Sequence, residues 1–117
     1  MTTHDIHGLA ESFGFVKDET YALLMFKVPP SEDYMTYNES IERTGADDFN
    51  GVTTHDVDFD VWCHSRSSLE ATISKVDSIM DENAVWMDGG FSRGSATYSQ
   101  EHGLWGASYS FTYRDKK

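Results

Sequence analysis

The end of the chain is a run in which every second residue is apolar. From Trp105 to Tyr113, apolar and aromatic side chains alternate with glycine, serine and threonine. Because successive side chains on a β-strand point to opposite faces, this alternation predicts a half-buried strand with one aromatic face and one face of small polar residues. A strand so rich in aromatic residues belongs to a core rather than to a catalytic loop. The chain is therefore expected to fold around a sheet.

A second alternating run covers Val52 to Cys63 and predicts another strand. Its apolar residues share one face, and its aspartates share the other face with a tryptophan. The first set is Val57, Phe59, Val61 and Cys63, and the second is Asp56, Asp58, Asp60 and Trp62. Cys63 is the single cysteine, so no internal disulfide is possible, and its position among the apolar residues predicts a small buried side chain.

Two helices are predicted beside these strands. In residues 4–13 the apolar side chains recur at helical spacing, with Thr3 as the expected N-cap and Gly14 as the stop. The second helix is expected to begin at a capping box, Ser67 to Glu70, and to end near Asn83. Its apolar stripe consists of Leu69, Ile73, Val76 and Met80.

The remaining segments are less regular. The apolar run from Tyr21 to Val28 fits a buried strand or a short helix, and periodicity leaves both open. Tyr34–Tyr37 predicts a short strand, Asn38–Gly51 a long polar loop or hairpin, and Ser95–Ser99 a weaker strand. The 117 residues are expected to form a single domain of class α+β. Its mainly antiparallel sheet would have about four strands, with two helices packed on one face.

The charge of the chain is acidic and uneven. The formal net charge is −11, and residues 1–62 hold thirteen acidic and three basic residues, against seven and six in residues 63–117. Nucleic-acid backbones are bound by cationic side chains, so sequence-specific nucleic-acid binding is not expected. Such a surface repels nucleic acid or matches a basic protein partner, although solubility alone also accounts for it.

Nothing in the sequence predicts a membrane protein. The longest apolar run, Tyr21–Phe26, is too short to cross a bilayer. The first residues do not combine a basic segment with an apolar one, as a signal peptide would. We therefore expect a soluble intracellular protein with no membrane partner.

The residue types that often carry catalysis or bind metals are not arranged for either. His4 and His7 could share a helix face, but a metal site normally needs further ligands. Asp56, Asp58 and Asp60 would be spread over about 13 Å of a straight strand, whereas calcium sites draw their ligands from a curved loop. The sequence has no nucleophile elbow, Walker loop, zinc-binding helix or cysteine pair. We expect no metal, no cofactor and no enzymatic activity.

Several short motifs between residues 34 and 113 carry a resemblance to a known family. They are Glu101-x-Gly103-Leu104-Trp105 followed by Tyr109-x-Phe111-x-Tyr113, Gly45-Ala46-Asp47-Asp48 before a strand, the serine-capped helix, and Met80-Asp81-Glu82-Asn83 at its end. With the element order and the small acidic domain, they resemble the tail terminator, or tail completion, proteins of long-tailed bacteriophages and related small proteins of phage tail modules.

The resemblance implies a structural role in the virion. Such proteins form a hexameric ring that caps the tail tube, stops its polymerisation and presents a surface to neck or head-completion proteins. It implies that this chain associates with copies of itself, with the tail tube protein and with a neck protein, in the host cytoplasm during assembly and then in the virion tail. An acidic ring lumen would repel the DNA that passes through it.

The expected contact residues follow from their positions in the chain. The Asn38–Gly51 loop offers Asp47, Asp48 and Phe49, and the Gly89–Arg93 loop offers Gly89, Gly90 and Arg93. Trp62, on the acidic face of its strand, is either an interface anchor or is covered by another part of the chain. The alternatives to a terminator are a head-closure, neck or minor capsid protein, and a small acidic protein that binds a host partner.

Overall fold

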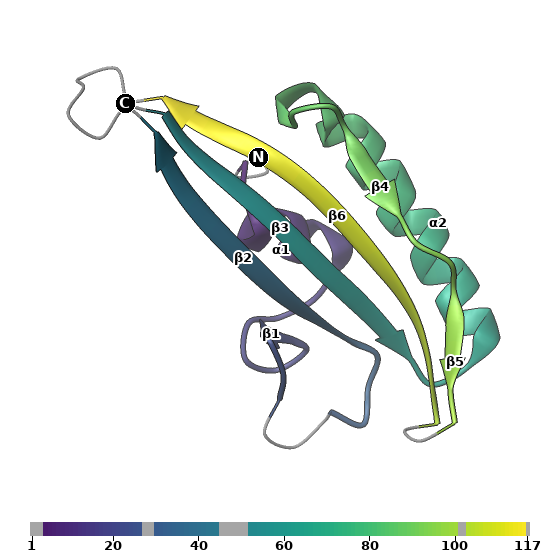
Figure 1. The fold of residues 1–117 in the computed structure, drawn as a ribbon. Helices are drawn as coiled ribbons and strands as arrows, with labels where there is room; N and C mark the ends of the chain where they lie inside the picture. The colour runs from purple at the N-terminus through teal and green to yellow at the C-terminus, as the bar shows by residue number, and fades with distance from the viewer. Residues whose placement is uncertain (1–3, 27–29, 45–51, 101–102, 117) are drawn as a thin grey trace.

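A six-stranded sheet and two helices form two layers (Figure 1). This is a computed structural model, and it describes residues 4–26, 30–44, 52–100 and 103–116. In chain order the elements are α1 (Ile6–Phe13), β1 (Tyr21–Leu23), β2 (Tyr34–Thr44), β3 (Val52–Cys63), α2 (Arg66–Asn83), the 3-10 turn η1 (Ala84–Trp86), β4 (Phe91–Arg93), β5 (Thr97–Ser99) and β6 (Leu104–Lys116).

The sheet is mixed and mostly antiparallel. The strand order is β1-β2-β3-β6-β4, with β5 also paired to β6, and only β1 and β2 run parallel to each other. The predicted α+β class and the mainly antiparallel sheet are confirmed. The predicted number of about four strands is wrong, because β1 and β4 add two strands of three residues each.

The core lies between the helices and one face of the sheet. Register pairs Val57 with Phe111 and Phe59 with Tyr109, so the apolar faces of β3 and β6 coincide. The rings of Phe59 and Tyr109 stack at 4.9 Å between centroids, and Phe13 of α1 lies 5.6 Å from Phe59. The alternation predicted in both long strands is therefore confirmed, and so is the burial of Cys63.

The helix ends differ slightly from those predicted. Asp5, rather than Thr3, caps α1, since its side chain accepts a hydrogen bond from the Gly8 amide at 2.8 Å. Gly14 ends α1 with a φ of 97°, a backbone conformation that glycine adopts without strain. Ser65, rather than Ser67, caps α2 and accepts from the Ser68 amide, because Ser65 has the extended backbone that an N-cap requires.

Two segments predicted as loops contain strands. Asn38–Thr44 continues β2, and all eleven residues of β2 pair with β3. Its mostly polar sequence gave no apolar alternation, so the pairing partner and not the local pattern makes this segment a strand. Phe91–Arg93 is β4, which pairs with β6. The Tyr21–Val28 run was left open between strand and helix, and in its described part, residues 21–26, Tyr21–Leu23 forms a strand.

Candidate interaction surface

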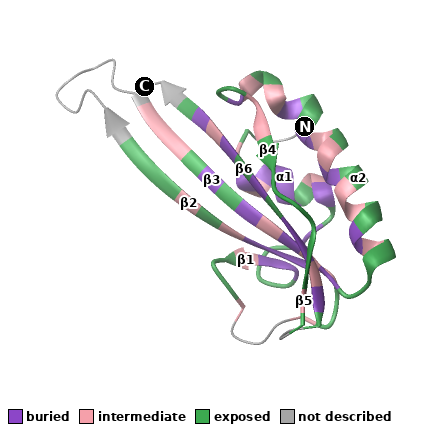
Figure 2. Ribbon diagram, turned by 45° about the vertical axis from the view of Figure 1, so that its right-hand side comes forward, coloured by how far each residue is buried: buried purple, intermediate pink, exposed green. Residues whose placement is uncertain are grey.

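The face of the sheet opposite the core carries polar side chains. Within the described part of the chain, no helix packs on this face. We call this surface the open face. It comprises Asp56, Asp58, Asp60 and Trp62 of β3 with Gly106, Ser108, Ser110 and Thr112 of β6. Figure 2 shows exposed positions along both strands between the buried positions that belong to the core. The aspartate row predicted from sequence therefore lies at the surface.

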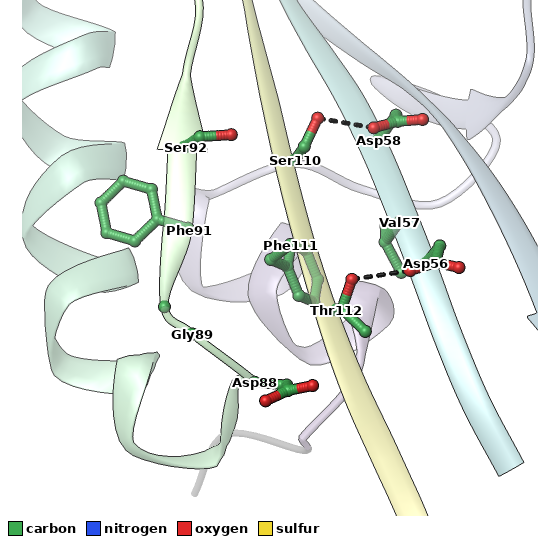
Figure 3. Close-up of a pocket in the computed structure, with 11 residues that line it drawn as sticks. Asp56, Val57, Asp58, Asp88, Gly89, Phe91, Ser92, Ser110, Phe111 and Thr112 are labelled. Carbon is green, nitrogen blue, oxygen red and sulfur yellow. Dashed lines mark hydrogen bonds between the residues drawn. The ribbon is translucent and has the colours of Figure 1, made fainter.

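Each aspartate of the row accepts a hydrogen bond from a hydroxyl of β6. Ser110 Oγ donates to Asp58 Oδ1 and Thr112 Oγ1 to Asp56 Oδ1, both at 2.6 Å (Figure 3). Ser108 Oγ donates to Asp60 Oδ1 in the same way. We call these three pairs the acid–hydroxyl ladder. Successive carboxylates on one strand face are about 6.6 Å apart. The ladder thus fixes a row of negative charge in place without neutralising it.

A depression of about 340 Å³ lies where the ladder meets the turn before β4. Asp56 and Asp58 line one side, and Asp88 and Gly89 line the other (Figure 3). The Asp88 amide donates to the Thr112 carbonyl at 2.7 Å, which holds the turn against β6. The lining of the depression is acidic and rich in hydroxyl groups, so the depression suits a cationic partner better than an anionic one.

Trp62 lies at the opposite end of the open face. Its indole Nε1 donates to Thr36 Oγ1 at 3.2 Å, and its ring lies over Gly106. It is half-buried and forms one wall of a groove of about 260 Å³. The chain therefore covers some of the ring, and the rest lines a groove, while the role of Trp62 as an interface anchor stays a prediction.

The residues predicted as contacts to other proteins lie in different parts of the structure. Gly89 and Gly90 lie at the edge of the open face, at the opposite end from Trp62. Arg93 is not beside them, because its register with Tyr109 turns it to the helix side, where its Nε lies 3.3 Å from Asp77. The other three predicted residues, Asp47, Asp48 and Phe49, lie outside the described residues.

Sequence reasoning missed the groove and the hydrogen-bonded partners of the aspartates. Leu24, Met25 and Phe26 line the groove with Leu104. Their signal was the apolar run of Tyr21–Val28, which periodicity alone could not place. The hydroxyl row was recognised as the small polar face of the last strand, but its pairing with Asp56, Asp58 and Asp60 depends on the register of two strands about fifty residues apart.

Three of the histidines contact other side chains of this chain. His4 stacks on Trp86, His7 Nδ1 lies 3.2 Å from the Tyr21 hydroxyl, and His55 Nδ1 lies 2.5 Å from Glu39. Within the described ranges, no group of three or more histidine, cysteine, aspartate or glutamate side chains is placed to hold a metal ion. Across the same ranges, no helix has the length and apolar character needed to span a bilayer.

Tyr109 holds its proton more tightly than a tyrosine in water does. Its side chain is 1% exposed, and its hydroxyl donates to Asp77 Oδ1 at 2.8 Å. Burial, together with the hydrogen bond and the negative charge of Asp77, raises the pKa of Tyr109 above its usual 10.0. The neutral phenol is therefore part of the packed core.

The free energy of unfolding is expected to fall as the pH rises above about 10, because the unfolded chain ionises Tyr109 there and the folded chain keeps the proton. One tyrosine contributes a slope of up to about 1.4 kcal/mol per pH unit. Urea denaturation of the wild type and Tyr109→Phe at several pH values checks this, and the variant should show the shallower slope. Equal slopes would contradict it.

Comparison with known proteins gives a match in structure alone. No family model matches the chain, and no curated protein matches it. A solved structure does match. It is a chain of the "Virion of native gene transfer agent (GTA) particle", with a TM-score of 0.56 and 14% identity, covering 93% of this chain and 84% of that chain. This protein therefore shares its fold with a chain of a virion particle.

Proposed function

We propose that this protein is a structural component of a bacteriophage virion and, within it, the tail terminator. Copies would form a ring of six that caps the tail tube, stops its polymerisation and meets a neck or head-completion protein. The observation that carries the proposal is the fold shared over 93% of the chain with a virion particle chain. The motifs of residues 34–113 support the same role. A non-enzymatic function is part of the proposal.

The open face supports a position next to DNA. In a ring whose open faces line the lumen, the acid–hydroxyl ladder of each copy would present Asp56, Asp58 and Asp60 to the passing duplex. Fixed carboxylates repel phosphates within a Debye length of about 8 Å at physiological salt. The lumen would then let DNA slide without binding it.

Phage made without this protein are expected to have tails of uncontrolled length, because nothing would stop the tube polymerising. Electron microscopy of purified tails checks this, and supplying the wild-type protein should restore a single length. Tails of uniform length in its absence would contradict the terminator role. In that case, particles that lack only the head–tail connection would indicate a head-closure or neck protein.

The ladder is tested separately by Asp56→Asn/Asp58→Asn/Asp60→Asn. Asparagine oxygens still accept the hydroxyl hydrogen bonds, so the ring should form and tail length should be normal. Loss of three charges per copy should lower infectivity by about tenfold or more, since electrostatic fields change encounter rates by that order. Asp81→Asn on the exposed side of α2 is the charge control. Unchanged infectivity of the triple variant would remove the lumen assignment.

A small acidic protein that binds a host partner is the second candidate, favoured by the charge of −11. Oligomer mass separates the two. A ring, formed alone or on adding tail tube protein, supports the terminator. A protein that stays monomeric with tail tube protein present and binds a basic host protein supports the second candidate.

A further inference from the structure

The groove beside Trp62 is lined mainly by apolar side chains and has acidic side chains at one end. Its walls include Met25, Phe26 and Tyr34 as well as Trp62, and Asp60 closes one side. A smaller depression of about 150 Å³ shares Leu24, Thr36 and Asp60 with it and extends to Asp58. An apolar site therefore leads directly onto the acid–hydroxyl ladder.

The chain leaves large apolar side chains exposed at the mouth of this groove. Leu24 is 61% exposed and Met25 is 74% exposed. Leu24 also has a φ of 63°, a left-handed conformation that costs energy for a leucine. Hydrogen bonds fix this turn, from the Leu24 amide to the Tyr37 carbonyl and from the Met25 amide to the Leu23 carbonyl, both at 2.7 Å. The fold thus holds two apolar side chains outward in a defined position.

We propose that the groove binds an extended segment of another protein that carries an apolar side chain followed by lysine or arginine. The apolar side chain would pack against Trp62 and Met25, and the cations would pair with Asp60 and Asp58. These aspartates lie about 6.6 and 13 Å along β3 from Trp62. An extended segment has nearly the same rise per residue, so cations two and four residues after the apolar anchor match the row.

Charge complementarity favours this occupant over a second copy. The most exposed apolar residue elsewhere in the described chain is Val85, at 90%. Val85 lies between Glu82 and Asp88 in the chain. If Val85 of a second copy entered the groove, these acidic residues would therefore come close to Asp60, and the like charges would repel. The inference does not require a ring or a tail, and the terminator role can fail without affecting it.

A synthetic peptide tests the proposal with the full-length protein. The probe is acetyl-Ser-Leu-Ser-Lys-Ser-Lys-Ser-amide, titrated into isotope-labelled protein and followed by NMR. We expect shifts of the Trp62 indole and the Leu24–Phe26 amides. A peptide with glutamate in place of both lysines, or serine in place of leucine, should bind at least about fivefold more weakly.

Variants locate the site. Asp58→Asn/Asp60→Asn and Met25→Ser should each weaken binding about fivefold, since the two exposed ion pairs together, and the partly buried apolar contact alone, contribute about 1 kcal/mol. Val85→Ser and Asp81→Asn are matched controls at exposed positions away from the groove and should bind like the wild type. Met25 is exposed, so its replacement leaves the fold intact.

Any one of three outcomes with the peptide would overturn the inference. They are no binding at peptide concentrations up to about 1 mM, shifts confined to other surfaces, and equal affinity for the lysine and glutamate peptides. Groove shifts that grow with protein concentration in the absence of peptide would assign the groove to a second copy and also overturn it.

Discussion

Replacing Phe59 by alanine is expected to lower the free energy of unfolding by about 3–5 kcal/mol. Phe59 is 1% exposed and lies at the centre of an aromatic cluster: its ring stacks on Tyr109, and Phe13 and Phe111 contact it at 5.6 and 6.3 Å between centroids. These neighbours come from both core layers, so the cavity left by alanine cannot close by movement of one side chain. Small domains have about 5–15 kcal/mol of stability in total, so the loss is a large share of it.

Urea denaturation followed by circular dichroism measures this effect. Val85→Ala is the control, because Val85 is 90% exposed and surface substitutions usually change stability by less than about 0.5 kcal/mol. A loss below about 1 kcal/mol for Phe59→Ala would mean that the stacked cluster does not form the core.

Gly106→Ala is expected to displace Trp62 and cost about 1–3 kcal/mol. A Cβ atom on Gly106 would lie 2.7 and 2.8 Å from ring carbons Cζ3 and Cε3 of Trp62. The indole has little room to move, since its Nε1 donates a hydrogen bond to the hydroxyl of Thr36, which is itself buried. Shifting the ring breaks that hydrogen bond and reshapes the groove wall.

Gly94→Ala is the matched control for this substitution. Its added Cβ would lie 3.7 Å from the Ser108 carbonyl oxygen, an ordinary contact. Denaturation midpoints and the NMR shift of the Trp62 indole distinguish the two variants. If Gly106→Ala keeps the wild-type indole shift and stability, Trp62 does not rest on Gly106 in solution. If Gly106→Ala moves the indole, the variant should also bind the leucine–lysine peptide more weakly than the wild type does.

Strands β3 and β6 and the two helices were predictable because each contains its own evidence. Alternation along β3 and β6 separates the side chains of the core from those of the open face, and every residue needed for that inference lies in the same segment. The helical spacing of α1 and the stripe of α2 carry the same kind of local information. The Asp56–Asp60 row could likewise be placed on one face before any partner strand was known.

Strands β1 and β4 and the groove could not be predicted in this way. β1 and β4 have three residues each, too few for a period, and they exist because β2 and β6 supply their hydrogen-bond partners. The polar half of β2 is a strand for the same reason. Arg93 was predicted as a contact residue from its place in a loop, and its position beside Asp77 depends on the register of β4 with β6, which no local pattern shows.

The sequence by itself determined which residues of β3 and β6 are buried and that the other face of β3 is acidic. The tertiary structure decided that hydroxyls of β6 hold the aspartates of β3, and that Leu24, Trp62 and Leu104 meet in one groove. The physical reason is the range of the interactions. Alternation follows from the geometry of a single chain segment, whereas register and grooves depend on which distant segments become neighbours.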